Sequence, residues 1–310
     1  MTRVAAVDCG TNSIRLLVAD ADPRTGELKE LDRRMEIVRL GQGVDRTGRL
    51  APEALERTFA ACRDYAAAIR ELGAERTRFV ATSASRDAEN RDEFVRGVVG
   101  ILGVEPEVIT GDQEAEYSFT GATHELSGSA HPRPYLVVDI GGGSTEFVVG
   151  EEHVRAARSV DIGCVRLTER HRLSDPVTDA ETAAMRADIA AALDRVAETV
   201  PLTEARSLVG LAGTVTTVTG IALGLDAYDS AAIHHTRVGV ERVAEIAERL
   251  LRSTHAERAA IPVMHPGRVD VIGAGALILL AIMERTGARE VIASEHDILD
   301  GIAHKLAADG

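Results

Sequence analysis

The chain has 310 residues, of which 45% are hydrophobic and 27% charged. This composition is typical of a folded protein, and the length favours two domains. The formal net charge of −14 argues against nucleic acid and anionic membranes as partners, because a polyanion binder normally presents a basic face. Lys29 and Lys305 are the only lysines, which excludes the Gly-Lys-Ser/Thr sequence of a Walker-type nucleotide site.

The first residues and the cysteines predict a cytoplasmic protein. The start MTRVAAVDCG has one arginine and an apolar run too short for a secretory signal. Cys9, Cys62 and Cys164 are widely separated and odd in number, as expected of reduced thiols, and Cys62 reads as a helix core position. The most apolar stretch, residues 269–283, is shorter than the roughly 20 residues that cross a bilayer.

An internal repeat divides the chain into two related halves. The segment VAAVDCGTNSIRLLVAD at residues 4–20 recurs in pattern as YLVVDIGGGSTEFVVGE at residues 135–151. In each copy an apolar run ends in aspartate, small residues follow and a second β-rich run begins, which predicts a tight hairpin. The copies align at a constant offset of 131 residues, with Asp8 matching Asp139, Gly10 matching Gly141 and Ser13 matching Ser144.

Strands and helices alternate after each hairpin, which predicts an α/β fold. The first half continues with a strand at residues 27–40, a helix that begins near Pro52, a strand at 77–81, a helix at 92–102, a strand at 107–110 and a helix from about Asp112. The second half continues with a helix at residues 179–199, a strand at 207–211, a glycine turn with its helix, the apolar stretch, a strand at 290–293 and a terminal helix.

The segment SGSAHPRP, residues 127–134, is the predicted link between the halves, because it is rich in small residues and proline. The sequence therefore predicts an N-terminal domain at residues 1–126 and a C-terminal domain at residues 127–310. Packing of the terminal helix on the first domain is the alternative to its place in the second.

The two hairpin turns are the candidate phosphate-binding loops. Three successive glycines in DIGGGSTE remove every Cβ where a phosphate would approach, and backbone N–H groups in such turns bind anions. The loop DCGTNS is a weaker signal alone, and its match to DIGGGSTE strengthens it. Facing one another across a cleft, the loops would enclose a phosphate. The candidate phosphate-binding residues are Gly10, Thr11, Asn12 and Ser13, and Gly141, Gly142, Gly143, Ser144 and Thr145.

Three carboxylates beside these loops are candidate metal ligands. Asp8 and Asp139 precede the turns, and carboxylates paired beside a phosphate are natural ligands for Mg²⁺ or Mn²⁺. Their alternative role is to hydrogen-bond their own turns. Glu146 follows the second turn, and its alternative role is that of a surface glutamate.

These two loops, together with ATSASRDAEN at residues 81–90 and ITGDQEAEYSFTGA at residues 109–122, resemble the exopolyphosphatase and guanosine pentaphosphate phosphatase family over essentially the whole chain. That family belongs to the actin, sugar kinase and Hsp70 superfamily. The resemblance therefore implies two duplicated actin-like (ribonuclease H-like) α/β domains with a central cleft. The chain ends soon after SEHDILDG at residues 294–301, so it is similar to the short two-domain subgroup, and the family suggests a homodimer.

The resemblance also identifies a catalytic base. In the family, a glutamate in the segment corresponding to ITGDQEAE activates water, and by position it matches Glu114 rather than Glu116. From the residues alone, Thr110 and Gln113 predict a capping box, and Glu114 is a first-turn carboxylate that the helix dipole favours. That local role is compatible with catalysis.

Arg86, within ATSASRDAEN, is a candidate ligand for a phosphoryl oxygen, because a guanidinium binds such oxygens in a bidentate manner. Its alternative is a surface ion pair with Asp87 or Glu89. A third glycine turn at residues 210–220 is equally compatible with anion binding and with close packing. His234 and His235 are adjacent and are predicted to point apart without binding a metal.

The sequence thus predicts a hydrolase that removes the terminal phosphate of inorganic polyphosphate with Mg²⁺ or Mn²⁺ and Glu114 as base. Guanosine pentaphosphate is the alternative substrate. A small-molecule kinase of the same superfamily and a catalytically silent polyphosphate or alarmone sensor are the alternative classes of protein.

Overall fold

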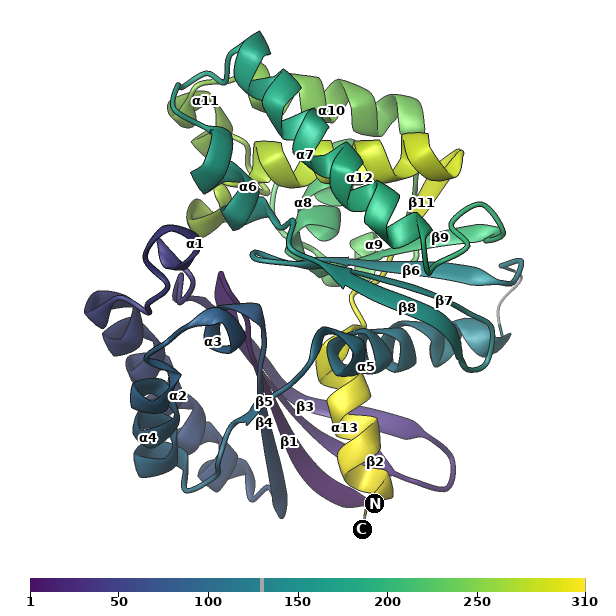
Figure 1. Ribbon diagram of the computed structural model, residues 1–310. Coiled ribbons are helices and arrows are strands. Elements are labelled where there is room, and N and C mark those ends of the chain that lie inside the picture. Colours follow the sequence, from purple (N-terminus) through teal and green to yellow (C-terminus); the bar gives the residue numbers. More distant parts are fainter. Residues whose placement is uncertain (129–130, 310) are drawn as a thin grey trace. The chain divides into compact units, whose positions relative to one another are not determined.

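The computed structural model describes residues 1–128 and 131–309 (Figure 1). The chain divides into two compact units, Met1–Gly121 with His296–Gly310, and Ala122–Glu295. The first division lies in the last turn of helix α5 (Gly111–Thr123), before the predicted link, whose Ser129 and Ala130 lie outside the described residues. The predicted domain ranges, 1–126 and 127–310, therefore differ from the units at this helix and at the C-terminal residues.

The first unit contains one five-stranded mixed sheet in the order β3-β2-β1-β4-β5. β1 pairs antiparallel with β2 and parallel with β4, so the predicted hairpin is confirmed. Its elements are β1 (Thr2–Cys9), β2 (Ser13–Asp22), β3 (Glu27–Ile37), α1 (Val44–Thr47), α2 (Pro52–Leu72), β4 (Arg76–Ala81), α3 (Ser83–Asp87), α4 (Arg91–Leu102), β5 (Glu107–Val108), α5 and α13 (Ile298–Ala308).

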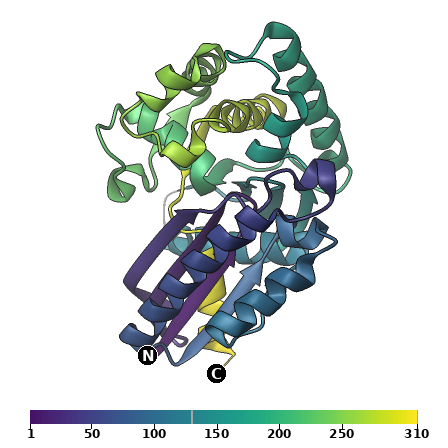
Figure 2. The ribbon, with the colours of Figure 1, turned by 90° about the vertical axis from the view of Figure 1, so that its left-hand side faces the viewer.

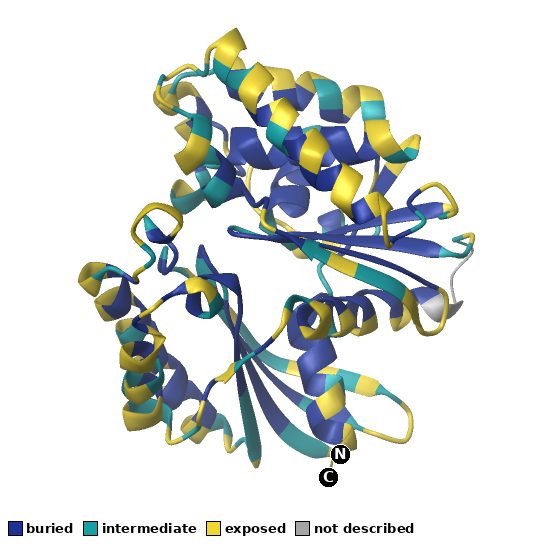
Figure 3. Cartoon of the chain, in the orientation of Figure 1, coloured by how far each residue is buried: buried dark blue, intermediate teal, exposed yellow. Residues whose placement is uncertain are grey.

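Side chains of β1 alternate between two apolar layers, as the pleat of a strand requires. Ala5, Val7 and Cys9 join the layer formed with α2 and α4, and Val4 and Ala6 join the layer formed with α13. Figure 2 shows α2 and α4 side by side over the sheet, and Figure 3 shows β1 buried along most of its length. The sheet is therefore covered on both faces, which explains the nearly continuous apolar run of β1.

Helix α13 completes the first unit, although it is last in the sequence (Figure 1). Ile298, Ile302 and Leu306 are buried against β1 and β2. The helix begins at Asp297, whose carboxylate accepts a hydrogen bond from the N–H of Leu299 at 3.0 Å. This apolar face and its cap give residues 296–310 a place in the first unit, so the range 127–310 is not one compact unit.

Close packing of α13 on α5 depends on Gly301, and its replacement by alanine is expected to destabilise the first unit. A Cβ at Gly301 would lie 2.0 Å from the backbone oxygen of Tyr117, which cannot move without shifting a helix. We expect Gly301→Ala to lower the free energy of unfolding by about 2 kcal/mol or more. Gly100→Ala in α4 is the control, because nothing lies within 4 Å of its new Cβ.

Urea denaturation of both variants measures the difference. Gly100→Ala should raise the free energy of unfolding by about 0.5–1 kcal/mol, because alanine restricts the unfolded chain and favours helix. Equal stabilities of the two variants would contradict the packing account of Gly301.

The second unit repeats the sheet order of the first and adds one strand, giving β10-β11-β9-β6-β7-β8. Here β6 pairs antiparallel with β7 and parallel with β9, the same relations as in the first unit. Its elements are η1 (Glu125–Gly128), β6 (Tyr135–Ile140), β7 (Thr145–Gly150), β8 (Val154–Val160), α6 (Cys164–His171), α7 (Asp179–Ala197), β9 (Ser207–Leu211), α8 (Ala212–Leu223), α9 (Ser230–Ile233), β10 (Arg237–Gly239), α10 (Val240–Arg252), α11 (His255–Ala259), η2 (Pro266–Arg268), α12 (Ile272–Thr286) and β11 (Glu290–Ala293).

The core of the second unit is one apolar cluster that joins the sheet to α7, α8, α10 and α12. Val138 and Ile140 of β6 contribute to it, together with the buried side chains of α12 from Ile272 to Met283. The apolar stretch at residues 269–283 is thus a core helix. In the described part of the chain, no helix combines the length and apolar character needed to cross a bilayer.

Candidate active site

The first glycine turn has its carbonyl groups held by other backbone groups. The N–H of Gly10 donates to the carbonyl oxygen of Ser13 at 2.9 Å, and the carbonyl of Thr11 accepts from the N–H of Gly41 at 2.9 Å. The Asn12 carbonyl accepts two further bonds from the segment after β3. With these carbonyls engaged and the Gly10 N–H donating within the turn, the remaining N–H groups of the turn are its means of binding an anion.

The second glycine turn repeats this arrangement. The N–H of Gly141 donates to the carbonyl of Ser144 at 3.0 Å, the counterpart of the first turn's hydrogen bond at an offset of 131 residues. The first N–H groups of α6 donate to the carbonyls of Gly141 and Gly142 at 3.0 and 2.9 Å. The Arg166 side chain donates through Nε to the carbonyl of Gly143 at 2.8 Å. All three glycine carbonyls are therefore fixed by α6.

Gly163 allows α6 to approach the turn this closely. A Cβ at this position would lie 2.4 Å from the carbonyl carbon and oxygen of Gly142 and 2.6 Å from the N of Gly143. Neither Gly163 nor Arg166 was predicted from the sequence. No pattern around them resembles a phosphate loop, because their role is to hold the turn from a later helix.

Asp8 lies at the end of β1 with its side chain buried, at 4% exposure. Its Oδ2 accepts hydrogen bonds from Arg15 at 2.6 and 3.1 Å, and Arg15 also pairs with Asp297. Burial raises the pKa of the Asp8 carboxyl above its ordinary value, and the Arg15 charge opposes that shift. Oδ1 is buried without a hydrogen-bond partner among the described residues, a position that suits a cation ligand.

Asp139 and Glu146 form the equivalent pair in the second unit, where they lie opposite one another on β6 and β7. Both are buried, and Oε1 of Glu146 accepts a hydrogen bond from the hydroxyl of Ser159 at 2.7 Å. In the first unit, Arg15 occupies the position that corresponds to Glu146 and lies opposite Asp8. The repeat thus carries a carboxylate in one copy and a guanidinium in the other. The offset of 131 residues, which relates Arg15 to Glu146, was the signal in the sequence that could have identified Arg15.

Arg86 and Glu114 lie together in the first unit. Nη1 of Arg86 is 2.9 Å from the carbonyl oxygen of Ile109 and 3.4 Å from Oε2 of Glu114. Glu114 is buried, with 8% exposure, in the first turn of α5. Arg86 thus contacts the predicted base.

Helix α3 connects this pair with the first turn. The hydroxyls of Thr11 and Ser83 are 2.8 Å apart, and Ser83 is the first residue of α3, which also carries Arg86. The predicted capping box at the start of α5 is confirmed, because Thr110 and Gln113 exchange hydrogen bonds of 2.9 and 3.2 Å. The structure therefore brings together the first loop, Arg86 and Glu114 within one unit, and Ser83 is an addition that the sequence analysis missed.

The third glycine turn is largely a packing device. A Cβ at Gly210 would lie 2.8 Å from the side chain of Val215, and one at Gly220 would lie 2.7 Å from Val263. At Gly213 a Cβ would overlap the guanidinium of Arg268, at 1.7 Å from its Nη1. The contacts of Gly210 and Gly220 explain these two glycines without any ligand, whereas Gly213 meets only the end of the long Arg268 side chain.

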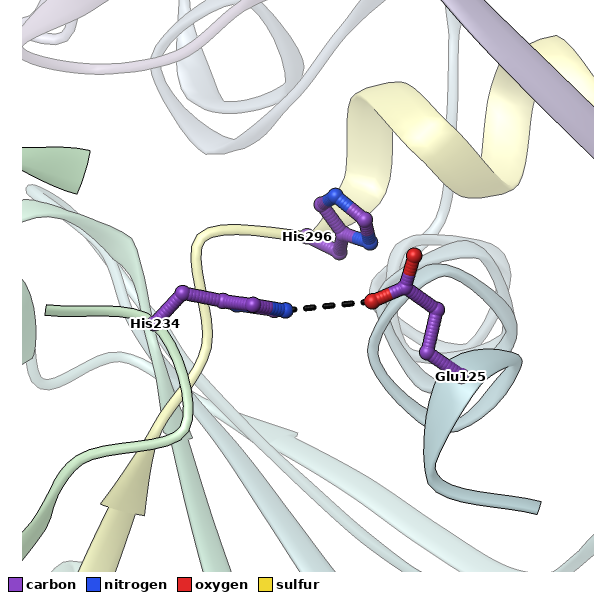
Figure 4. Close-up of side chains that lie close together, drawn as sticks. All are labelled: Glu125, His234 and His296. Atoms are coloured by element: carbon purple, nitrogen blue, oxygen red, sulfur yellow. Dashed lines mark hydrogen bonds and ion pairs between the residues drawn. The ribbon is translucent and has the colours of Figure 1, made fainter. Parts of the chain in front are cut away.

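His234 and His235 do not point apart, so that prediction was wrong. Their rings stack with centroids 3.7 Å apart, because His235 has a φ of 60° and the pair is not in regular structure. The nitrogen Nε2 of His234 lies 3.1 Å from Oε2 of Glu125 (Figure 4). Its Nδ1 accepts a hydrogen bond from the N–H of Glu295 at 3.1 Å. Both ring nitrogens therefore have hydrogen-bond partners in the second unit.

Comparison with known proteins identifies the family to which the chain belongs. Residues 17–307 match the model of the Ppx/GppA phosphatase family, and the chain belongs to that family. Membership makes it a hydrolase of phosphoanhydride bonds.

Three similar proteins illustrate the family. Exopolyphosphatase 2 of Mycobacterium tuberculosis H37Rv is 54% identical over 99% of both chains. The crystal structure of an exopolyphosphatase-like protein has 42% identity and a TM-score of 0.96 over 99% of both chains. The guanosine-5′-triphosphate,3′-diphosphate pyrophosphatase of Aeromonas salmonicida is 28% identical over 97% of this chain and 59% of that protein. The predicted fold class, α/β with two duplicated actin-like domains, is confirmed by the match to the exopolyphosphatase-like crystal structure and by the repeated strand order.

Proposed function

We propose that the protein is an exopolyphosphatase that hydrolyses the terminal phosphoanhydride of inorganic polyphosphate and releases phosphate. The observation that carries the proposal is the contact of buried Glu114 with Arg86. Arg86 is on α3, whose first residue, Ser83, contacts Thr11 of the first glycine turn, and carbonyl groups of that turn accept backbone hydrogen bonds. The 54% identity to a protein named Exopolyphosphatase 2 supports the same substrate.

The proposed phosphate ligands are the two glycine turns. Phosphoryl transfer needs positioning and charge neutralisation more than covalent chemistry, so N–H groups that are already oriented lower the barrier. Arg86 is proposed to bind an oxygen of the terminal phosphoryl group. The full set of proposed phosphate-binding residues is Gly10, Thr11, Asn12, Ser13, Arg86, Gly141, Gly142, Gly143, Ser144 and Thr145.

We propose Asp8, Asp139 and Glu146 as the residues that hold Mg²⁺ or Mn²⁺. Hard divalent cations prefer carboxylate oxygens, and the buried Oδ1 of Asp8 fits that requirement. When bound, the metal neutralises charge on the phosphoryl oxygens. Arg15 positions Asp8, and Ser159 positions Glu146.

Glu114 is proposed to accept the proton of the attacking water, which forms a bond to the terminal phosphorus as the bond to the leaving phosphate oxygen breaks. Arg86 keeps the carboxylate directed and binds the same phosphoryl group. No residue becomes covalently attached to phosphate in this scheme, and the products are phosphate and a polyphosphate chain shortened by one unit.

The proposal is tested by phosphate release from short-chain polyphosphate, long-chain polyphosphate and guanosine pentaphosphate, each with Mg²⁺, Mn²⁺ or EDTA. We expect release from polyphosphate that requires the metal. A higher kcat/KM for guanosine pentaphosphate would move the assignment to the activity in the name of the Aeromonas relative. Tight binding of polyphosphate without release would instead indicate a sensor.

Removal of the Ser159 hydroxyl is expected to weaken metal binding. Its hydrogen bond to Glu146 fixes the orientation of that carboxylate, and such supporting contacts typically change metal affinity by about 10–100-fold. We expect Ser159→Ala to raise the Mg²⁺ concentration for half-maximal activity about tenfold, with little change of rate at saturating Mg²⁺. An unchanged Mg²⁺ titration would remove Glu146 from the proposed metal ligands.

We further propose that the protein acts in the cytoplasm as a homodimer and does not use nucleic acid or membranes as partners. The net charge of −14 supports the last point, and the buried, unpaired state of the three cysteines is compatible with a reducing compartment.

A further inference from the structure

The second unit contains a cavity of about 490 Å³ that the proposed reaction does not use. It lies at the amino ends of three neighbouring strands, where His131, Arg206 and Glu290 stand just before or at the start of β6, β9 and β11. Its volume is within the range of about 300–1,000 Å³ that is usual for small-molecule sites.

The mouth of the cavity carries an excess of positive charge in a strongly acidic chain. Arg206, Arg237 and Arg289 contribute guanidinium groups, and Glu290 contributes the one carboxylate of the lining. Nη1 of Arg237 pairs with Glu290 at 2.9 Å. The side chains of Arg206 and Arg289 are exposed and have no hydrogen-bond or ion-pair partner within residues 1–128 and 131–309. Two cationic groups are therefore available to an anion.

His131 adds no positive charge to this excess. Its Nδ1 accepts a hydrogen bond from Nη2 of Arg237 at 2.9 Å, so the ring is oriented as a neutral acceptor. Burial and the Arg237 charge both hold the pKa of His131 below its ordinary value. The same hydrogen bond fixes Arg237 between His131 and Glu290.

The floor of the cavity is apolar. Leu136, Leu208 and Ile292, each with 4% exposure or less, line it from the three strands, and Leu202 lines it from the segment before β9. An inorganic anion would meet the arginines but would leave this floor without an apolar partner. A ligand that joins a phosphate to a flat organic ring satisfies both parts.

The cavity is separate from the second glycine turn. The turn follows Ile140 at the carboxyl end of β6, whereas the cavity lies before Tyr135 at its amino end. Six residues of extended strand span about 20 Å. A ligand in the cavity therefore does not occupy the turn.

We propose that this cavity binds a nucleotide, with its phosphate on Arg206 and Arg289 and its base against the apolar floor. The proposal does not depend on the substrate of the phosphatase reaction. A single guanidinium binds phosphate oxygens in a bidentate manner, and Arg206 and Arg289 both line the cavity with exposed side chains.

Isothermal titration calorimetry of the full chain with GMP tests the proposal. We expect one site per chain, and we expect Arg206→Ala/Arg289→Ala to weaken binding at least tenfold while leaving polyphosphate hydrolysis unchanged. The control is Arg249→Ala/Arg252→Ala, which removes the same charge from exposed positions at the far end of α10 and should bind GMP normally. Asp139→Asn should also bind GMP normally, because Asp139 lies beside the glycine turn at the carboxyl end of β6 and does not line the cavity.

Three results would overturn the proposal. The first is no heat of binding with GMP up to millimolar concentration. The second is loss of binding in Asp139→Asn but not in the Arg206/Arg289 double variant, which would place GMP at the glycine turn. The third is tighter binding of tripolyphosphate than of GMP with the same dependence on both arginines, which would identify a site for the inorganic chain.

Discussion

Replacing Glu114 by glutamine is expected to lower the rate of phosphate release from polyphosphate by about 10²–10⁴-fold, the usual contribution of a general base. Glutamine keeps the size of the side chain and can still accept a hydrogen bond from Arg86, but it does not accept a proton from water. Because Glu114 contacts Arg86 at 3.4 Å in a buried position, binding of polyphosphate should change much less than the rate.

Glu116→Gln is the matched control for this substitution. Glu116 is on the same helix two residues later, but it is exposed, so its variant should keep the wild-type kcat within about twofold. Initial rates of phosphate release, with thermal unfolding to verify the fold, measure both variants. Equal activity of the Glu114 and Glu116 variants would show that another group accepts the proton.

Arg86→Lys is expected to lower kcat by about 10²-fold, although the positive charge is kept. An arginine that stabilises the transferred phosphoryl group is worth about 10³–10⁵ in rate, and lysine retains part of that electrostatic contribution. The planar guanidinium reaches the Ile109 carbonyl and the Glu114 carboxylate through the same Nη1 and leaves its other donors for phosphate. A lysine ammonium cannot hold these contacts and a phosphoryl oxygen in the same geometry.

Arg91→Lys provides the comparison, because Arg91 is an exposed residue at the start of α4. We expect steady-state kinetics with polyphosphate to show wild-type behaviour for it. The Arg86→Lys/Glu114→Gln double variant should lose less than the product of the single effects, because the two residues act on one phosphoryl group. A nearly wild-type Arg86→Lys would mean that Arg86 only supports the fold.

Much of the fold was predictable because the repeat is strong. The apolar runs before Asp8 and Asp139, with a glycine turn after each, predicted both hairpins, and the structure confirms the same hydrogen bond across each turn. The position of α13 could not be derived from periodicity, because an apolar helical face does not indicate which sheet it covers. Its ion pairs, Asp297 with Arg15 and Asp300 with Arg33, join residues more than 250 positions apart.

The sequence predicted those site residues that lie within recognisable motifs. It did not predict residues that support the motifs from distant segments. Glu114 was identified by resemblance and Arg86 by its guanidinium chemistry within ATSASRDAEN, and their contact is a property of the fold. The second turn and its glutamate are supported by later segments, through Gly163, Arg166 and Ser159. The residues next to DIGGGSTE therefore did not indicate them. The cavity at the amino ends of β6, β9 and β11 likewise depends on arginines that are distant in sequence.

In the proposed reaction, water directed by Glu114 with a bound metal attacks the terminal phosphorus of a polyphosphate chain. Hydrolysis of tripolyphosphate in ¹⁸O-labelled water with Mg²⁺, followed by mass spectrometry of the products, tests it most directly. We expect one ¹⁸O in the released phosphate, none in the pyrophosphate of the first turnover, and no release in EDTA. Label in the pyrophosphate instead, or release that continues in EDTA, would contradict it.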